Sequence, residues 1–448
     1  MMTPITTLDE PARTTPVIGE FEVVVLGGGP AGIAAAVAAG RTGRKTLLVE
    51  RYGFLGGMGT AAGVTNFCGL HANVHGEHKR VVFGVASEFL DRIDKLGGLN
   101  QPHLSFQNKI QAQAYDTSAY KVAADELLAA NRVKVLFHAL AVGARTEQGR
   151  VKALFVETKE GRAAIRGEVF IDCSGDGDLS AWAGAPYEKG DGHGGMLYSS
   201  MLFRIANVDP ERAGRAWEVI PRMMAEAEQK GSHRFPRKGA IVRPQRDPTE
   251  WRANCTQVKK SDGGPLDALD AEELSEGEIQ GRRQAWSVFE FIKQSVPGFE
   301  RAYIVELGPQ LGVRETRRVL GAYQLSEADV LGCANFDDSI GVNGWPVEAH
   351  VAGDVVIKFP PIPESRGYCQ LPYRMIVPLE VENLFVAGRC ASMTHDGQSA
   401  ARVSGGCFVM GEAAGTAANI CLAEGTTPRE VDAIRLGEIL RDNGSFLG

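Results

Sequence analysis

The amino-acid sequence predicts an α/β fold with a Rossmann-like dinucleotide-binding domain, and three observations near the N-terminus support this. Residues 23–26 form an apolar run that leads into a turn with glycine at positions 27, 29 and 32. An alanine-rich segment follows, and then a second apolar run, 46–49, that ends on Glu50. This order is typical of a dinucleotide-binding βαβ unit: a strand, a glycine turn, a helix, a second strand and a carboxylate. Together with the later strand runs, this predicts a central parallel sheet, a three-stranded β-meander and an inserted α+β domain.

The residue types of the turn suit a phosphate site. Gly27 lets the chain turn sharply, Gly29 lets backbone approach a pyrophosphate, and Gly32 lets the helix pack close to the sheet. The helix N-terminus presents free N–H groups and partial positive charge to the phosphates. A carboxylate about 20 residues further on can accept hydrogen bonds from a ribose diol. The expected contacts in this stretch are Gly27, Gly29, Pro30, Ala31, Gly32 and Glu50.

Bulk composition is that of an ordinary globular protein. The chain has 448 residues, 44% of them hydrophobic and 23% charged, which predicts two or three packed domains. The net charge is −7 and no long basic run occurs, so the sequence argues against a nucleic-acid partner. No run approaches the length of about 18 apolar residues that a membrane span needs. The first 20 residues lack the apolar core of a secretory signal, so we expect a flexible arm and a cytoplasmic location.

The eight cysteines are scattered singly, and no two have the C-x-x-C spacing. This argues against a thioredoxin-type dithiol, an iron–sulfur cluster and a zinc ribbon. We expect reduced, mostly buried thiols and no metal site.

The rest of the chain predicts how the domains are arranged. Helical patterns cover 87–96 and 117–131, and three strand runs follow at 133–142, 150–158 and 163–175. From 185 the pattern changes to polar loops, a helix over 270–294 and mixed strands such as 201–205. Near 383 a short apolar strand ends in glycine, and the segment 399–423 is expected to form one long helix with small residues on one face. The predicted domains are a flexible arm (1–20), the nucleotide-binding domain (21–184 and 376–448) and a substrate domain (185–375).

With these segments in place, the chain resembles the FAD-dependent oxidoreductases of the glutathione-reductase-like two-dinucleotide-binding superfamily. The blocks that carry the resemblance are VVVLGGGPAGIAAAVAAGRTG, FLGGMGT, VFIDCSGDGDLSAWAGAPYEKG, GVRETRRVLGAYQLSEADV, LPYRMIVPLEVENLFVAGR and RVSGGCFVMGEAAGTAA. They extend from residue 21 to about 421, nearly the whole chain. The resemblance implies FAD as the cofactor, held without a covalent bond, whereas the substrate varies widely within this group.

The resemblance also implies which residues contact FAD. The glycine turn would hold the pyrophosphate and Glu50 the adenosine ribose, with Arg51 over the adenine. The N-terminus of the late helix would point at the flavin N1/O2 edge, where reduced flavin carries negative charge. Many relatives have Ala-Thr-Gly where this chain has Asp172-Cys173-Ser174-Gly175, and we expect Cys173 to be a buried, inert thiol. The further implied contacts are Gly56, Gly57, Met58, Thr60, Leu140, Gly175, Asp176, Gly388, Arg389, Arg402, Gly405 and Gly406.

Four side chains are candidates for the chemistry: His395, Arg314, His350 and Arg374. His395 lies between the late strand and the flavin-facing helix, where a base with a pKa near neutrality can take the substrate proton. Arg314, in the cluster GVRETRR, can bind an anionic group of the substrate. His350 and Arg374 occur in loops that the family uses around its cleft. A structural role is the alternative for each of the four, as a helix cap, a hydrogen-bond partner or part of an arginine network.

Cys68 and His71, just after the second glycine loop, offer a route to covalent flavin attachment. Most members of such families hold FAD without a covalent bond, so we expect no tether here.

The sequence favours a flavoenzyme that removes a hydride and a proton from a small organic substrate, with FAD reoxidised by oxygen, quinone or a carrier protein. One alternative is an NAD(P)H-dependent reductase or hydroxylase, although only one intact GxGxxG unit is present. Another is a flavin-bound partner subunit that has lost its own catalysis. A nicotinamide dehydrogenase is disfavoured, because it needs no second segment that returns to the cofactor. Homo-oligomerisation is common for such folds, but no sequence feature specifies it.

Overall fold

The glycine-rich stretch forms the expected βαβ unit. In the computed structural model, which describes residues 6–448, β1 (Val17–Leu26) runs through the glycine turn into α1 (Pro30–Gly40), and β2 (Thr46–Val49) follows. Gly27 has a φ of +97°, and a Cβ at this position would lie 2.4 Å from the carbonyl oxygen of Cys173, so glycine is required. The strand begins at Val17, so residues 17–20, predicted as part of the flexible arm, belong to β1 instead. Residues 1–5 of that arm lie outside the described residues.

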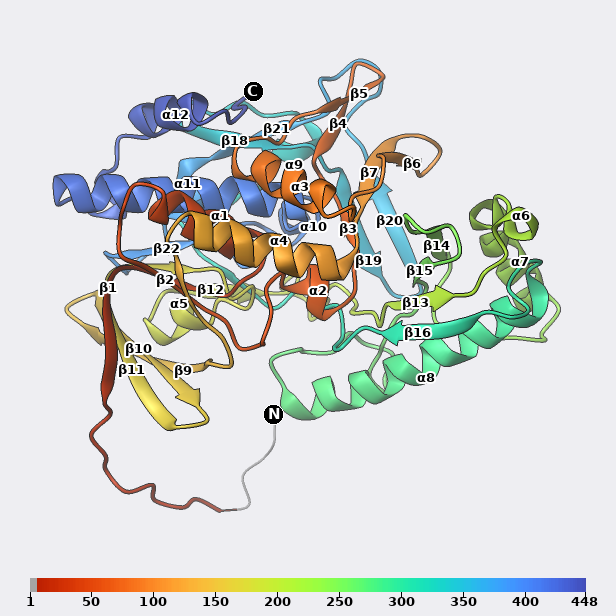
Figure 1. The fold of residues 1–448 in the computed structure, drawn as a ribbon, viewed down its shortest axis with the longest axis horizontal. Helices are drawn as coiled ribbons and strands as arrows, with labels where there is room; N and C mark the ends of the chain where they lie inside the picture. The colour runs from red at the N-terminus through yellow and green to blue at the C-terminus, as the bar shows by residue number, and fades with distance from the viewer. Residues whose placement is uncertain (1–5) are drawn as a thin grey trace.

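The central sheet is mostly parallel and has the order β8-β2-β1-β11, with β22 paired to the end of β11 (Figure 1). Side chains of β1 alternate between two cores: Val23 and Val25 lie in one, Val24 and Leu26 in the other. Both faces of the sheet are therefore buried, which explains the unbroken apolar run in the sequence. The other strands of this parallel part are β8 (Lys134–Leu136), β11 (Gly161–Asp172) and β22 (Leu384–Val386).

The predicted meander is formed by β9 (Leu140–Glu147), β10 (Arg150–Thr158) and β11, which pair antiparallel in that order. The prediction of one strand over 133–142 is wrong, because this run forms two strands. The first, β8, extends the parallel sheet beside β2, and the chain changes direction at His138, which has a φ of +52°. The short helix α5 (Asp178–Trp182) contacts both β9 and β11.

Helices α1, α3 (Val85–Lys95), α4 (Thr117–Ala130) and α11 (Ser404–Glu424) form the layer on the other face of the sheet (Figure 1). Helix α11 lies directly on α1. A Cβ at Gly411 would lie 2.1 Å from the carbonyl oxygen of Ala31, and one at Gly415 would lie 2.2 Å from that of Ala35. The small residues of the late segment therefore allow close helix packing.

The prediction of one helix over 399–423 is wrong. The segment forms α10 (His395–Ala401) and α11, separated at Arg402 and Val403. Val403 has extended backbone, with φ −73° and ψ 166°, so a second helix N-terminus is created at Ser404. Within the described part of the chain, α11 is the one helix with the length and apolarity of a membrane span, with a mean hydropathy of 1.2. It is 78% buried over that stretch, as expected for a core helix.

The predicted inserted region, 185–375, contains a separate core and a segment that rejoins the first one. The separate core extends from Met201 to Leu311. It surrounds an antiparallel sheet of order β14-β15-β13-β16, with helices α6, α7 and α8 at the right of Figure 1. The elements are β13 (Phe203–Ala206), α6 (Pro210–Ala213), α7 (Ala216–Gln229), β14 (Ile241–Pro244), β15 (Trp251–Asn254), α8 (Ala271–Ser295) and β16 (Tyr303–Leu307).

Residues from Leu325 to Val377 contribute to the first core instead. Their strands pair as β18 with β21 and β19 with β20, while β12 pairs with β17. The elements are β12 (Tyr187–Lys189), β17 (Arg317–Val319), α9 (Glu327–Leu331), β18 (Ser339–Asn343), β19 (Val347–Val351), β20 (Asp354–Lys358), β21 (Cys369–Pro372) and η1 (Tyr373–Ile376). The remaining elements are α2 (Met58–Ala61), β3 (Asn66–Phe67), β4 (His71–Val74), β5 (Glu77–Arg80), β6 (His103–Ser105), β7 (Ile110–Ala114), η2 (Pro428–Glu430) and α12 (Ala433–Asp442).

Candidate active site

A cavity of about 1380 Å³, its open mouth included, lies where β1, β2, β11 and β22 end. Residues one or two positions after the end of each of these four strands contribute to its wall: Gly27, Glu50, Cys173 and Gly388. Ligands of open α/β sheets bind outside the carboxyl ends of the strands, so this is the expected position of a site. The wall also contains Leu202, Asn254 and Gly312 to Arg314, which come from the residue before β13, from β15 and from the segment after β16.

Glu50 is held in place at the end of β2. Its carboxylate accepts hydrogen bonds from the backbone N–H of Gly28 at 2.7 Å and of Tyr52 at 3.0 Å. The side chain is buried yet borders the cavity. Each carboxylate oxygen can accept more than one hydrogen bond, so Glu50 can still receive the hydroxyls of a ribose.

The second glycine loop closes over the first one. The Gly56 N–H donates to the carbonyl oxygen of Gly28 at 2.8 Å, and Thr60 Oγ1 donates to the Leu55 carbonyl oxygen at 2.7 Å. A Cβ on Gly57 would lie 2.9 Å from Gly29 Cα. The two backbones therefore contact each other without side chains between them.

The strand ends β11 and β22 are joined by an ion pair. Arg389 donates to Asp176 Oδ1 at 2.8 Å and to Thr316 Oγ1 at 3.1 Å, and Thr316 also donates to Asp176 at 2.9 Å. Burial alone would raise the pKa of Asp176, but Arg389 outweighs it and lowers the pKa. The first and last segments of the chain are thus fixed to each other at the cavity.

The N-terminus of α11 also borders the cavity, through Val403, Ser404 and Cys407. The Gly405 N–H donates to the Cys68 carbonyl oxygen at 2.9 Å, and Ser404 Oγ contacts both backbone groups of Cys68. Burial raises the pKa of the Cys68 thiol to about 12 and that of Cys173 well above its usual range. Both are therefore protonated, unreactive thiols near neutral pH.

The cavity brings together most of the cofactor contacts predicted from the sequence. Those in its wall are Gly27, Gly29, Pro30, Ala31, Glu50, Arg51, Gly57, Met58, Gly175, Gly388, Arg389 and Arg402. The predicted residues outside the wall mostly support it, such as Gly32, where a Cβ would lie 1.8 Å from the Gly27 carbonyl oxygen. Leu140 is 51% exposed at the start of β9, away from this wall. The predicted residues outside the wall are Gly32, Gly56, Thr60, Leu140, Asp176, Gly405 and Gly406.

Two of the four candidate catalytic residues, Arg314 and His350, lie in the wall. Arg314 donates to the Tyr198 carbonyl oxygen at 2.7 Å and to Ser200 Oγ at 2.9 Å. His350 Nε2 lies 3.2 Å from Glu348 Oε1, and its Nδ1 lies 3.4 Å from Nη1 of Arg237. His350 is buried, and burial lowers its pKa well below its usual range.

Glu348 completes the pair with His350. It is 12% exposed, lines the cavity, and accepts a hydrogen bond from Trp345 Nε1 at 2.8 Å. Burial would raise its pKa, but the hydrogen bond from His350, the charge of Arg402 and the hydrogen bond from Trp345 outweigh burial and lower the pKa to about 2. The pair is therefore an ionised carboxylate beside a neutral imidazole, in which Nε2–H donates to Glu348 and Nδ1 is the acceptor nitrogen.

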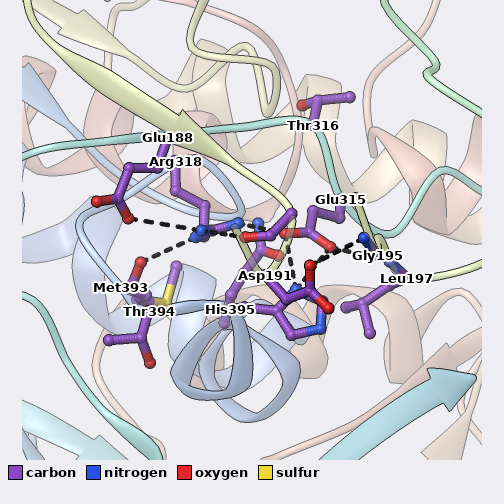
Figure 2. Close-up of polar contacts among 12 residues, drawn as sticks. Glu188, Asp191, Gly195, Leu197, Glu315, Thr316, Arg318, Met393, Thr394 and His395 are labelled. Atoms are coloured by element: carbon purple, nitrogen blue, oxygen red, sulfur yellow. Dashed lines mark hydrogen bonds and ion pairs between the residues drawn. The ribbon is translucent and has the colours of Figure 1, made fainter. Parts of the chain in front are cut away.

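His395 is not brought to the cavity wall. Figure 2 shows its ring in a separate polar cluster, where Nδ1 lies 3.0 Å from the carboxylate of Glu315. Glu315 also contacts Arg318 and accepts a hydrogen bond from the Leu197 N–H at 2.9 Å. Because backbone alternates direction along an extended segment, Arg314 lines the cavity while the next residue, Glu315, points into this cluster.

Arg374 also lies away from the cavity wall. It is 49% exposed and ion-paired with Asp338 at 2.9 Å. Its place in η1 lets it fix the surface turn at Asp338.

Sequence reasoning missed Glu348, Arg237, Asn254 and Arg252 as residues of this region. A signal for Glu348 was available, because residues two apart on a strand share a face and Glu348 stands two before His350 on β19. The arginines and Asn254 come from the inserted sheet. Their approach to the cavity depends on tertiary packing, which no local pattern encodes.

This geometry defines the class of protein: a dinucleotide-binding α/β protein whose last strand and helix return to the nucleotide cavity. The residues fit FAD, because glycine-rich backbone borders the cavity at the turn that would hold the pyrophosphate and Glu50 borders it where the ribose would lie. The N-terminus of α11 borders the same cavity. The chain belongs to the FAD dependent oxidoreductase family, whose description matches residues 22–440. It is therefore an FAD-dependent oxidoreductase.

Similarity to individual proteins is local or distant. A 45-residue stretch is 49% identical to dihydrolipoyl dehydrogenase of Trypanosoma brucei brucei, covering 10% of this chain and 9% of that protein. Similar solved structures include a geranylgeranyl bacteriochlorophyll reductase-like protein from Thermoplasma acidophilum, at 13% identity and a TM-score of 0.47, covering 96% of this chain and 84% of the other. A p-nitrophenol 4-monooxygenase from Pseudomonas putida has 12% identity and a TM-score of 0.48, covering 96% and 90%. Likeness at this level indicates no shared reaction.

Proposed function

We propose that this FAD-dependent oxidoreductase removes a hydride and a proton from a small organic substrate, with His350 as the proton acceptor. The observation that carries the proposal is the buried Glu348–His350 pair in the cavity wall. FAD, bound without a covalent bond along the glycine loops, would supply the hydride acceptor. Oxygen, a quinone or a carrier protein would then take the electrons.

The protonation state of the Glu348–His350 pair supports this role for His350. A neutral imidazole can take a proton at Nδ1, and an ionised carboxylate on Nε2–H stabilises the imidazolium that results. Arg237 contacts Nδ1 at 3.4 Å, which is a long hydrogen bond. Substrate can therefore displace it at little cost. Trp345 fixes the other oxygen of Glu348, so the carboxylate keeps its orientation toward the ring.

The cavity also suits a substrate that must be shielded from water. Apolar and aromatic side chains in the wall include Phe67, Tyr115 and Tyr120, and all three are buried. A dry site strengthens the electrostatic interactions between substrate and protein. The cytoplasmic location expected from the sequence stays a prediction, and homo-oligomerisation stays a possibility that no sequence feature specifies.

The test is anaerobic mixing of the purified holoenzyme with a panel of amines, alcohols and amino acids. One compound should bleach the flavin absorbance without NAD(P)H. With that compound, His350→Gln should slow bleaching by about 10²–10⁴-fold, and Glu348→Gln should slow it too. The matched control is Glu276→Gln, on the exposed face of α8, which should bleach at the rate of the wild type.

Two results would reject the proposal. If NADPH alone bleaches the flavin quickly and no organic donor does, the protein is a reductase or hydroxylase. If His350→Gln and Glu348→Gln bleach at the wild-type rate with flavin still bound, the pair does not handle the proton.

A further inference from the structure

Four buried or half-buried arginines lie in or beside the cavity wall without a carboxylate ion pair among the described residues. Arg314 and Arg402 line the cavity, whereas Arg237 contacts the wall residue His350 and Arg252 is two residues from Asn254 on β15. Arg237, Arg252 and Arg314 are buried, and Arg402 is half-buried. Within residues 6–448, none of the four forms an ion pair with a carboxylate. Glu348 acts on three of them electrostatically, but its own contacts go to His350 and Trp345. The region therefore holds an excess of buried positive charge.

The inserted sheet concentrates this charge. Arg252 on β15 stands directly opposite Arg204 on β13 and Arg243 on β14, so three arginines occupy one row of the sheet. Like charges directly opposite destabilise a sheet. Arg204 is neutralised by Glu306 at 2.9 Å, with two further acids nearby. Among the described side chains, Arg243 and Arg252 form no ion pair. The charge of Glu218 still acts on Arg243, so Arg252 is the arginine of this row whose positive charge is left uncompensated.

Arg252 is one of three arginines in this group, with Arg237 and Arg402, whose Nε has no hydrogen-bond partner among the described residues. Among the same residues, the Nη2 of Arg252 contacts only the ring of His103, at 3.3 Å. Burial and Arg252 lower the pKa of His103 to about 3, so that ring is neutral and offers no countercharge. Burial also lowers the pKa of Arg252 to about 10, which leaves it charged near neutral pH.

Arg252 is not itself a wall residue, but it lies on β15 close to residues that line the cavity. Asn254, two residues along the same strand and therefore on the same face, lines the cavity with its Oδ1 unpartnered within the described residues. Arg252 also interacts electrostatically with Cys68 and Tyr115, which both line the cavity. The glycine loops that would receive the FAD pyrophosphate form a different part of the wall. Arg252 is therefore left for another anion.

We propose that the substrate carries a carboxylate that pairs with Arg252 and Arg314 of the inserted region. This pairing orients the substrate toward the flavin. This inference rests on the proposed function and names its substrate class. Arg guanidinium groups bind carboxylates in a charge-assisted, often bidentate way. The carboxylate would neutralise the positive charge of Arg252 and accept a hydrogen bond from its Nε. An unpaired buried guanidinium destabilises a protein, so binding is the physical reason to keep one here.

The test measures flavin absorption difference spectra of the holoenzyme during titration with acetate and with benzoate. Each is compared with its uncharged isostere, acetamide or benzamide. We expect at least one carboxylate to perturb the spectrum at a concentration at least about tenfold below its amide. Arg252→Met should weaken that binding about tenfold or more. Arg283→Met, an exposed arginine of α8, is the matched control and should leave it unchanged.

Thermal unfolding separates binding from a structural role. Arg252→Met should unfold at the same temperature as the wild type or higher, because it removes an unpaired buried charge. Equal affinity for amide and carboxylate would overturn the proposal, and so would the absence of any carboxylate effect. A lower unfolding temperature with unchanged carboxylate affinity would also overturn it. In each case the flavin is bound and donor oxidation can be measured separately, so failure here is distinct from failure of the proposed function.

Discussion

Glu315 and His395 form a buried pair, with 3.0 Å between Nδ1 and the carboxylate and no exposed surface on the Glu315 side chain. Burial alone would lower the pKa of His395, but the hydrogen bond and charge of Glu315 outweigh it and raise the pKa. Glu315 also binds Arg318 and the Leu197 N–H, as Figure 2 shows. The pair therefore connects α10 to the segment beside the cavity.

We predict that this pair stabilises the protein more strongly at low pH. A histidine with a raised folded pKa contributes stability that is complete below its unfolded pKa, about 6.5, and is lost as the pH rises through the folded pKa. His395→Gln should therefore cost about 1–3 kcal/mol at pH 6 and clearly less at pH 9. Thermal or urea unfolding at both pH values measures this. His193→Gln, in an exposed loop, is the control, and an equal loss at both pH values would contradict the prediction.

Gly32 supports the first glycine turn, and we predict that Gly32→Ala prevents FAD retention. The new Cβ would lie 1.8 Å from the Gly27 carbonyl oxygen, so the helix or the turn must move. Such overpacking costs about 1–3 kcal/mol or more and displaces the phosphate-binding backbone. The flavin-to-protein absorbance ratio after gel filtration measures the effect. Gly143→Ala is the matched control, because its Cβ would meet the nearest atom at an ordinary 3.8 Å.

Glu412 is a buried carboxyl in α11 whose pKa is raised by burial to about 7. It accepts a hydrogen bond from the Val85 N–H at 3.0 Å. Because the folded pKa of Glu412 is raised, the folded state binds its proton more tightly than the unfolded state does. The protonated carboxyl therefore favours folding at low pH, and this contribution is lost as the pH rises through about 7. Glu412→Gln should therefore stabilise the protein by about 2–3 kcal/mol at pH 8.5, with a much smaller gain at pH 5.

Urea unfolding of Glu412→Gln at the two pH values gives this comparison. The control is Glu438→Gln on the exposed face of α12. A destabilised Glu412→Gln at pH 8.5 would mean that the ionised carboxylate, rather than the neutral acid, belongs to the fold.

We predict that FAD is held without a covalent bond. Cys68 lines the cavity, but burial raises its thiol pKa to about 12, so little thiolate exists to form a bond. His71 lines a different, smaller hollow with His78. Trichloroacetic acid should therefore release all yellow colour into the supernatant. Colour that stays with the precipitate and disappears in Cys68→Ala would reveal a thioether instead.

Local signals in the sequence were sufficient for the βαβ unit, the meander and the return of the C-terminal segment. Strand alternation, turn glycines and apolar runs act over a few residues, so they can be recognised without tertiary information. The helix break at Val403 was missed because both flanking segments favour helix, and the break depends on packing between Gly405 and Gly69.

The candidate site was predictable in part. The cofactor side follows from the glycine turn and Glu50, whereas the substrate side depends on where the inserted sheet packs. His395 was expected above the flavin because of its position between strand and helix, yet the buried Glu315, 80 residues away in sequence, holds it elsewhere. Arg252 gave no signal, since an arginine in a strand is normally a solvent-exposed residue.

The central claim is that the two terminal segments of the chain close around one molecule of FAD that accepts hydride from an organic donor. Visible absorption spectroscopy of the purified protein during anaerobic addition of donors tests it most directly. We predict that the protein shows the absorption bands of oxidised flavin, either on purification or after incubation with FAD. One carboxylate-bearing compound should then bleach these bands. Protein that stays colourless after incubation with excess FAD and gel filtration would contradict the claim.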